Sequence, residues 1–461
     1  MANSQYRLFN SPHVRLATKT TALEVLFLFD TNPENCVTLP GVSGSRFSMP
    51  IISQVNALDA RFDLHDGAGS DAIHTDPQYG YGVTRLHTDS DLSGTGIAYT
   101  LGGGTNLVCD AIDLLSAPLV GRDIEELMAN FGEVQRQIAE EPRIRWLGPH
   151  KGVIHLALSS ITNACFDLWA KHRGVPLWKL LLDLPSDALA NLVDFTYLEE
   201  VLPRKEFIEI FDRNRSSRGD RDSVLKSGYP GYDTSVGWIQ YSDDVIQENV
   251  KRAIDAGFTA MKLKVGLKDS NEDIRRAELV RNTAGTDATI MLDANQIWSL
   301  PVAIEVGLRL NEINPYWLEE PTEPDDVIAH QTLARELAPT PIAVGEAVSN
   351  RIIWKNFFQA NAVGICQADC TRLAGVSEYL AVVAMAKKFN VKVVPHVGDM
   401  GQIHQHLVFF NHIALDLPKL FLEHIPHLRE HFVVPANVSK GVYQAPEAPG
   451  CSTDLKCAMS S

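Results

Sequence analysis

Met261-Lys-Leu-Lys-Val265 is a short apolar run with a lysine at every second position, and later apolar runs of the chain also stop on charged residues. The residues that end these later runs are Asp293, Glu319, Glu346, Asp369 and His396. From Lys264 onward, successive endings are 23 to 29 residues apart, close to the ~30 residues that each unit of an eight-stranded β/α barrel uses. Such a barrel gathers the C-terminal ends of its strands on one face, where catalytic groups lie. The sequence therefore predicts an α/β barrel with a reaction centre at that face.

Strand-like and helical segments alternate through the second half of the chain, which indicates a parallel sheet with helices outside it. The first barrel strand is expected at residues 192–197, followed by a loop at 228–231 and an amphipathic helix at 243–257. Further strands are expected at residues 260–265, 289–293, 316–319, 342–345, 363–367, 391–395 and 420–423.

The pattern divides the chain into four parts. Residues 1–50 alternate short apolar stretches with turn formers and are expected to be a poorly ordered extension. Residues 51–190 combine strand-like stretches with helical patterns, which predicts an α+β capping domain. Its polar, glycine-containing stretch 65–71 is suited to being a mobile lid. The barrel with its metal site is assigned to residues 191–425, and residues 426–461, rich in turn formers, are expected to pack back on the capping domain.

The composition excludes some classes of function. The 461 residues include 41 Lys and Arg against 57 Asp and Glu, a formal net charge of −16, and this acidity disfavours sequence-independent binding to nucleic acid. No membrane span is expected, because no apolar run approaches the ~20 residues that cross a bilayer. Seven cysteines without a Cys-x-x-Cys pair indicate reduced thiols in an intracellular compartment. We therefore expect a cytoplasmic protein with a small-molecule partner; the basic segment before Glu24 leaves a mitochondrial location open.

Asp293, Glu319 and Glu346 close three consecutive predicted strands. Three carboxylates that converge on one point repel one another unless a cation lies among them. Oxygen ligands suit a hard divalent ion, and Mg²⁺ keeps open positions for water and substrate. Glu320 follows Glu319 directly, so the two-residue period of a strand places its side chain on the opposite side. The sequence thus predicts a Mg²⁺ site made by Asp293, Glu319 and Glu346.

Two bases are expected beside this site. Lys262 and Lys264 are two residues apart on one strand, so their side chains share a face and each ammonium group should lower the proton affinity of the other. One of them is then a plausible base near neutral pH. His396 and Asp369 end neighbouring strands, and a carboxylate that holds one imidazole nitrogen orients the ring and raises its basicity. A base, an acid and a divalent cation together suit the removal of a proton next to a carboxylate through an enediolate.

This combination of residues resembles the mandelate racemase branch of the enolase superfamily, whose sites use a Lys or His base with Mg²⁺. Over roughly residues 52–450 the chain is also similar to the L-fuconate dehydratases of that branch. The segments that carry this similarity are 146–155, 167–171, 176–180, 234–238, 291–296, 318–322 and 430–434.

The resemblance implies an α+β capping domain over a modified (β/α)₇β barrel, Mg²⁺ dependence and a hydro-lyase activity. The reaction would be dehydration of a sugar acid, L-fuconate or a similar aldonate such as galactonate or arabinonate, to the 2-keto-3-deoxy acid. By position, Lys264 would take the α-proton and Lys262 would neutralise carboxylate charge. His396, oriented by Asp369, would help the β-hydroxyl leave as water. The residues assigned to substrate binding are Asn295, Glu423 and Trp238. Members of this family commonly assemble, so a homo-oligomer is expected.

Two departures from the relatives leave the precise sugar open: Ala374 stands where a glycine is usual, and the altered loop after His396 carries Asp399. Two other functions also fit the residues. The same two opposed bases could racemise or epimerise a 2-hydroxy acid without loss of water. A relative without catalysis could instead keep the barrel for a binding role.

Overall fold

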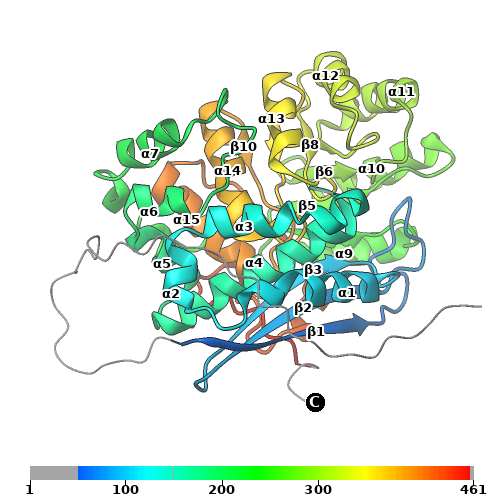
Figure 1. Cartoon of the computed structure of the whole chain (residues 1–461). Helices are drawn as coiled ribbons and strands as arrows, with labels where there is room; N and C mark the ends of the chain where they lie inside the picture. Colours follow the sequence, from blue (N-terminus) through cyan, green and yellow to red (C-terminus); the bar gives the residue numbers. More distant parts are fainter. Residues whose placement is uncertain (1–49, 149, 457–461) are drawn as a thin grey trace, which may run out of the picture. The chain divides into compact units, whose positions relative to one another are not determined.

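The computed structural model describes residues 50–148 and 150–456, so the extension predicted at residues 1–50 lies outside the described part, apart from Pro50. The first elements are three antiparallel strands, drawn in blue in Figure 1. These strands are β1 (Ile52–Phe62), β2 (Tyr79–Thr88) and β3 (Ser93–Thr100). They occupy the segments that the sequence predicts to be extended.

Helix α4 (Gly152–His172) forms the core of the capping domain. Two glycines of β3 allow the sheet to approach it closely, because a Cβ atom at Gly94 or Gly96 would collide with the α4 backbone near Ala164 and Ser160. By length and composition α4 could cross a membrane, but 89% of its apolar stretch is buried inside the protein. It therefore behaves as the buried helix of a folded core.

The remaining helices before the barrel are short. Residues 124–139 form two helices rather than one, because the backbone leaves the helical conformation at Asn130, with a φ of −143°. The helices are α1 (Thr105–Ser116), α2 (Ile124–Ala129), α3 (Phe131–Ala139), α5 (Leu177–Asp183), α6 (Ser186–Asn191), α7 (Arg204–Arg213) and α8 (Val224–Ser227). Single 3₁₀ turns lie at Ala117–Leu119, Pro142–Leu147, Arg218–Asp220, Asn311–Ile313 and Pro426–His431.

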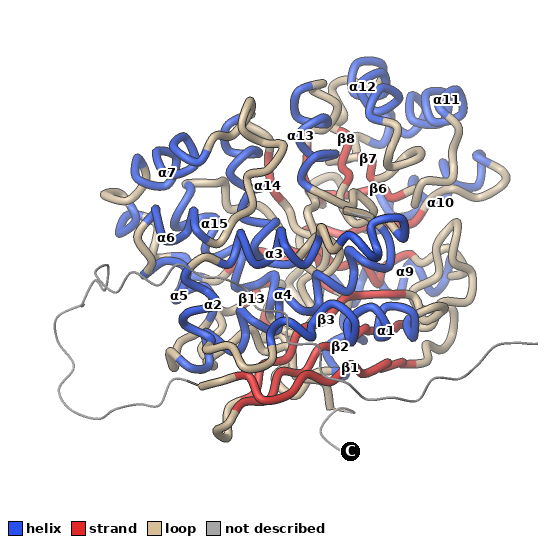
Figure 2. The backbone as a smooth tube through the Cα atoms, viewed as in Figure 1, coloured by secondary structure: helices blue, strands red, loops and turns tan. Residues whose placement is uncertain are grey.

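Eight parallel strands follow, and a helix comes after each of the first seven, which is the predicted (β/α)₇β order. Figure 2 shows these helices in blue outside the strands in red. The strands are β4 (Tyr229–Gly237), β5 (Ala260–Lys264), β6 (Thr289–Asp293), β7 (Leu318–Glu319), β8 (Ile342–Val344), β9 (Ile365–Cys366), β10 (Lys392–Val393) and β11 (Leu422–His424). The helices are α9 (Asp243–Asp255), α10 (Ser270–Ala284), α11 (Leu300–Leu310), α12 (Val327–Glu336), α13 (Arg351–Gln359), α14 (Gly375–Lys388) and α15 (Ile403–Leu415).

The sheet is hydrogen-bonded from β4 through β10 in chain order, and β11 pairs with β4. Within the described residues β10 and β11 form no strand pair, so a seam remains between them. One backbone hydrogen bond crosses the seam, from Gly398 N to Glu423 O at 2.8 Å. Asp399 adds side-chain contacts, because its Oδ2 accepts from the Ile425 backbone N at 2.7 Å and lies 2.8 Å from the Tyr443 hydroxyl. At this seam, side-chain contacts hold the two strands together in place of the backbone hydrogen bonds that join the other strands.

The prediction of a first barrel strand at residues 192–197 is wrong. These residues form turns, in which Phe195 packs edge-on against Phe207 and Asp194 pairs with Arg351 at 2.5 Å. A short apolar run can be buried in a loop as well as in a strand. The first strand is instead β4, whose Pro and Gly residues argued for a loop. One of those glycines, Gly237, has no space for a Cβ atom beside the Leu263 side chain.

The C-terminal segment contacts the capping domain. Asp454 accepts a hydrogen bond from Thr95 Oγ1 on β3 at 2.5 Å and pairs with Lys171 of α4 at 2.8 Å. His431 Nδ1 lies 3.0 Å from the Tyr81 hydroxyl on β2. A short hairpin of β12 (Val438–Ser439) and β13 (Val442–Tyr443) extends the sheet beyond β4.

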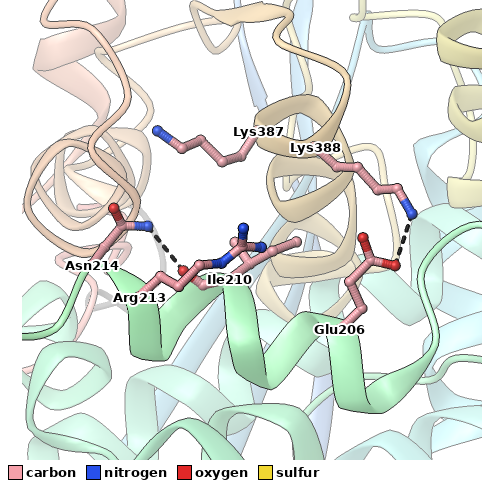
Figure 3. A pocket seen from close by; sticks show the side chains of 6 residues that line it. All are labelled: Glu206, Ile210, Arg213, Asn214, Lys387 and Lys388. Atoms are coloured by element: carbon pink, nitrogen blue, oxygen red, sulfur yellow. Dashed lines mark hydrogen bonds and ion pairs between the residues drawn. The ribbon is translucent and has the colours of Figure 1, made fainter.

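A depression of about 330 Å³ lies between α7 and the C-terminal end of α14, on the outside of the barrel (Figure 3). Its rim carries Lys387 and Lys388, and Lys388 is already paired with Glu206 at 2.7 Å. None of the predicted site residues lines it, so this depression is separate from the predicted reaction centre at the strand ends.

Candidate active site

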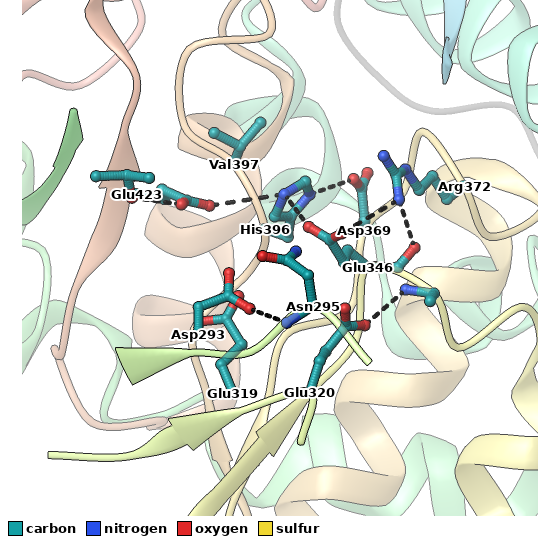
Figure 4. A network of polar contacts seen from close by, with 12 residues as sticks. Asp293, Asn295, Glu319, Glu320, Glu346, Asp369, Arg372, His396, Val397 and Glu423 are labelled. Atoms are coloured by element: carbon teal, nitrogen blue, oxygen red, sulfur yellow. Dashed lines mark hydrogen bonds and ion pairs between the residues drawn. The ribbon is translucent and has the colours of Figure 1, made fainter. Parts of the chain in front are cut away.

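The predicted site residues come from neighbouring parallel strands, and the strand register sets several of them at one level. Lys264 pairs with Asp293 in the β5–β6 register, and Asp293 pairs with Glu319 in the β6–β7 register. Figure 4 shows the acidic side chains and His396 turned toward one another at these strand ends. The residues that follow the next three strands are Glu346, Asp369 and His396.

Both lysines of β5 are buried among carboxylates. Lys262 Nζ lies 2.8 Å from Glu319 Oε1, 2.8 Å from Glu423 Oε1 and 3.3 Å from Asp293 Oδ2. Lys264 Nζ lies 2.6 Å from Asp293 Oδ2. The structure therefore brings acids from β6, β7 and β11 to one pair of amines.

The expected low proton affinity of these lysines is wrong for this arrangement. Burial lowers the pKa of Lys264, and so does the charge of Lys262, but the Asp293 carboxylate together with the more distant acids around it holds the pKa above its usual value. Burial likewise opposes the charge of Lys262, yet Glu319 and Glu423 hold its pKa well above the ordinary range. The prediction considered only the repulsion between the two ammonium groups and left out the acids that neighbouring strands bring to them.

Glu320 lies among the acids, although the two-residue period placed it on the opposite side. Strand β7 ends at Glu319, and Glu320 has a φ of 42°, so strand alternation stops before it. Its carboxylate accepts hydrogen bonds from Gln296 Nε2 at 2.7 Å and from the Ala347 backbone N at 3.2 Å. Burial and then the neighbouring Glu346 carboxylate raise the pKa of Glu320 well above its usual range.

His396 is held between two carboxylates. Its Nδ1 lies 2.8 Å from Asp369 Oδ2 and its Nε2 lies 2.7 Å from Glu346 Oε2. Burial lowers the pKa of His396, but Glu346 and Asp369 outweigh burial and raise it to about 10. The other oxygen of Asp369 accepts hydrogen bonds from the backbone and hydroxyl of Thr371 and lies 3.2 Å from His404 Nε2. Asp369 is thus fixed on both sides, and it fixes the His396 ring.

The three residues assigned to substrate binding line the same cavity as Lys264 and His396. Glu423 Oε1 accepts a hydrogen bond from Thr234 Oγ1 at 2.5 Å. Asn295 Oδ1 accepts one from Lys264 Nζ at 3.0 Å, and the same Nζ lies 5.6 Å from the centre of the Trp238 ring system. Each of the three is therefore placed within reach of a molecule held between the two bases.

The acidic side chains at the strand ends have the excess negative charge that a divalent cation would balance, although their oxygens are not gathered around one point. Within residues 50–148 and 150–456, no group of three or more His, Cys, Asp or Glu side chains has its donor atoms gathered as a ready metal site, because the acids turn to lysines or to His396. Yet the six acids, when all are ionised, face only four cations with His396 counted as charged, and one divalent ion would balance the two remaining negative charges. The acids are Asp293, Glu319, Glu320, Glu346, Asp369 and Glu423; the cations are Lys262, Lys264, Arg372 and His396.

The excess of acid is visible in Glu319. Burial and the neighbouring Asp293 carboxylate raise the pKa of Glu319 to about 7, although Lys262 opposes them. A cation among these oxygens would return the carboxyl group to its ionised form. The donor set, all carboxylate oxygen, is the kind that Mg²⁺ prefers.

A cavity of about 40 Å³ lies between the strand ends and the capping domain. Its lining from the capping domain consists of Gly69, Asp71, Tyr79, Tyr99 and Leu101. The lid stretch is anchored to the loop after β4, because the Ile239 backbone N donates to Ser70 O at 3.0 Å. The space left between these side chains holds no more than a few water molecules.

The sequence analysis gave no role to Arg372, which also lines this cavity. Its guanidinium group donates to the Glu346 carbonyl oxygen at 3.1 Å and lies 4.9 Å from the centre of the Tyr99 ring. Arg372 follows Asp369 by three residues, so its place just past a strand end was a usable signal. Tyr99 gave no such signal, and Asp71 was marked only as the last residue of the predicted lid stretch, because the place of both in the cavity depends on how the capping domain sits on the barrel.

Two family models match the chain. The N-terminal domain model of mandelate racemase and muconate lactonizing enzyme matches residues 67–181, and the enolase C-terminal domain-like model matches residues 245–459. The chain is 39% identical over 415 residues to mitochondrial enolase superfamily member 1 of Homo sapiens, covering 88% of this chain and 94% of that one. It is 36% identical over 414 residues to the L-galactonate dehydratase of Hypocrea jecorina, covering 88% and 92%.

Solved structures agree with the fold. The crystal structure of human mitochondrial enolase superfamily member 1 matches with a TM-score of 0.86 at 38% identity, covering 89% of this chain and 96% of that one. The L-talarate/galactarate dehydratase of Salmonella typhimurium LT2, liganded with Mg and L-lyxarohydroxamate, matches with a TM-score of 0.70 at 25% identity, covering 92% and 95%. The predicted capping domain and TIM-like barrel are confirmed, with the β10–β11 seam as the difference from a closed barrel.

Proposed function

This chain belongs to the mandelate racemase branch of the enolase superfamily, and from that premise we propose that it is a Mg²⁺-dependent hydro-lyase that dehydrates a sugar acid to the 2-keto-3-deoxy acid. The observation that carries the proposal is the single cavity onto which Lys264, His396 and the strand-end carboxylate Glu346 open. Its relatives from Hypocrea and Salmonella are named as sugar-acid dehydratases, which supports the same reaction class here.

Asp293, Glu319 and Glu346 would hold the Mg²⁺, as the sequence predicts. When bound there, Mg²⁺ supplies positive charge that stabilises an ionised carboxylate and the charge that develops on it as the neighbouring proton leaves. Glu320 reaches the same group of acids with its oxygens held by Gln296 and Ala347. We therefore assign Glu320 to supporting the site and keep the three predicted residues as ligands.

The chain's own residues carry the proton transfers. Lys264, once Asp293 is no longer its partner, would take the proton from the α-carbon. His396, whose pKa Glu346 and Asp369 raise to about 10 against the effect of burial, would give a proton to the β-hydroxyl as it leaves as water. Asp369 would hold the ring in place, and Lys262 would balance the charge of the substrate carboxylate.

The three residues predicted to bind substrate would make the contacts with it. Glu423 and Asn295 offer a carboxylate and an amide to substrate oxygens, and Trp238 offers a ring face beside Lys264. We propose L-fuconate or a similar aldonate, such as galactonate or arabinonate, as the substrate. We also propose a cytoplasmic homo-oligomer; the mitochondrial alternative would show as organelle import of a full-length fluorescent fusion.

A panel of aldonic acids, incubated with the purified protein and Mg²⁺, tests the proposal. Formation of a 2-keto-3-deoxy acid from at least one member is the expected result. Exchange of the α-hydrogen with solvent deuterium without loss of water would instead identify a racemase or epimerase. Neither product nor exchange from any acid, with metal binding shown separately by calorimetry, would leave a non-catalytic binding protein.

A further inference from the structure

We infer that Asp71 restricts the site to sugar acids with a single carboxylate, so that the enzyme takes aldonates and rejects aldarates of the same configuration. This inference rests on the proposed function and concerns the end of the substrate that does not react. Among the relatives, one acts on L-talarate and galactarate, which carry two carboxylates, and another acts on L-galactonate, which carries one. The reaction alone therefore does not choose between the two classes of acid.

The reacting end of the substrate decides where the other end lies. Lys264 and His396 would flank the α-carbon, and the strand-end acids with Lys262 would face the reacting carboxylate. The rest of a linear sugar acid must then extend toward the other wall of the cavity. That wall comes from the capping domain and presents Asp71, Tyr79 and Tyr99.

Asp71 gives this wall a negative charge. Among the described residues that line the cavity, the capping domain contributes no Lys, Arg or His to balance it. The Asp71 side chain is 10% exposed, so little water reaches it. Asp71 lines the same cavity as Lys264 and His396, so its side chain borders the space into which the rest of the substrate would extend.

The Asp71 carboxylate is fixed in direction by its own loop. Its Oδ1 accepts hydrogen bonds from the backbone N atoms of Ile73 at 2.8 Å and of His74 at 2.6 Å. Its Oδ2 lies 3.0 Å from His74 Nδ1, and the His74 side chain is 42% exposed, so His74 approaches from the solvent side. A carboxylate oxygen accepts about two hydrogen bonds, so Oδ2 can accept one more, from a substrate hydroxyl.

The loop itself is anchored, which makes the position of Asp71 reproducible. Ser70 O accepts from the Ile239 backbone N at 3.0 Å, and Ser70 Oγ accepts from the Gln240 backbone N at 3.3 Å. Both donors lie in the loop after β4, next to Trp238. Asp71 is therefore held against the barrel by backbone contacts of its neighbour.

The two classes of substrate meet this wall differently. The terminal hydroxyl of an aldonate can donate a charge-assisted hydrogen bond to Asp71. The second carboxylate of an aldarate would bring like charge next to Asp71, whose side chain is 10% exposed and so has little water around it to screen the repulsion. Rejection by an unfavourable contact is a common source of specificity.

Arg372 is the cation of the lining that could oppose this effect, since it lies against Tyr99. Its charge is already matched by Glu346, whose carbonyl oxygen it contacts at 3.1 Å and whose Oε1 lies at 3.7 Å. We therefore assign Arg372 to holding Glu346 rather than to a second substrate carboxylate.

The test compares pairs of substrates that differ only at the last carbon, such as galactonate and galactarate, with the full chain and Mg²⁺. For the wild type we expect kcat/KM for the accepted aldonate to exceed that for its aldarate by at least about 100-fold. Equal turnover of both members of a pair would overturn the inference. If no acid of either class reacts, the proposed function fails instead, so the two failures are distinguishable.

Asp71→Asn sharpens the test, because it removes the charge and keeps an oxygen for the backbone N atoms of Ile73 and His74. We expect opposite changes: kcat/KM falls several-fold for the aldonate and rises about tenfold or more for the aldarate, mainly through KM. A variant that was merely less stable would lose activity on both. Equal losses on both substrates would therefore overturn the role of Asp71.

Asp76→Asn is the matched control, since Asp76 lies exposed on the same stretch and does not line the cavity. It removes the same charge and should leave the aldonate-to-aldarate ratio unchanged. A wild type that accepts aldarates, together with loss of that activity in Arg372→Gln, would assign the distal end to Arg372 and overturn the inference.

Discussion

The two walls of the cavity differ in what they are made of. The barrel wall presents Lys264, Glu346, His396 and Glu423 from the ends of parallel strands, each paired with another buried charge. The cap wall presents phenol rings, a leucine and one carboxylate from a sheet and its connecting loop. Strand ends hold charged groups rigidly enough for proton transfer, whereas a loop and ring edges set shape and charge for recognition. Changes on the barrel wall should therefore act on kcat, and changes on the cap wall should act on KM.

Removal of the proposed base should produce the largest effect. Lys264→Ala should lower turnover by at least about 10³-fold, because it removes the amine that contacts Asn295 and lies over the Trp238 ring, where the α-proton would be taken. Mg²⁺ binding, measured by calorimetry, should survive. The exposed Lys268→Ala on the following loop is the control. Retained turnover in Lys264→Ala would remove Lys264 from its role.

Loss of the proposed acid should separate the two halves of the reaction. His396→Asn should lower formation of the 2-keto-3-deoxy product by about 10²–10³-fold. Lys264 remains, so exchange of the α-hydrogen with deuterium should continue and can be followed by NMR. If exchange stops together with dehydration, the two barrel-wall residues do not act separately.

The packing of His427 between the two walls should stabilise the fold less at low pH. His427 stacks on Tyr79 of the cap wall, with ring centres 5.3 Å apart, and lies 6.2 Å from Trp238 of the barrel wall. Burial lowers the pKa of His427 from 6.5 to about 4. Because the unfolded chain binds the proton first, the stability due to the neutral ring is present above pH ~6.5 and is lost as the pH falls toward 4.

For this residue the loss on acidification is on the order of 3 kcal/mol. Unfolding in urea at a series of pH values measures it, with His427→Gln beside the wild type. The variant should show a flatter decline between pH 6.5 and 4. Parallel declines in the two proteins would rule out His427 as the source.

A small change on the cap wall should give the smallest effect. Tyr99→Phe removes a hydroxyl from the cavity lining and keeps the ring that stacks on Arg372. We expect KM to rise about three- to tenfold, the size of one lost hydrogen bond. Steady-state kinetics on the accepted aldonate measures this. A loss that falls on kcat instead would break the division between the walls.

The barrel wall could be predicted from the sequence, because strand period and spacing act locally. Lys264, Asp293 and Glu319 end the strands where the pattern placed them. The same local rules failed for β4, which is rich in Pro and Gly, and for Glu320, which lies one residue past a strand end. The lysine pKa values also escaped prediction, since they depend on acids from other strands. Of the cap wall, only the lid stretch that ends at Asp71 could be predicted, because the positions of Asp71 and Tyr99 in the cavity arise from the docking of two domains.

Asp399 is the side chain that holds the eighth strand at the seam. Glu423 lies on β11, which pairs with β4 on one side and is held on the other side mainly by the Asp399 side chain. A substitution at Asp399 would shift β11 and its Glu423, while the strand pairing from β4 to β10 stayed intact. Evolution or an engineer can therefore retune this edge of the cavity at a position that never touches the substrate.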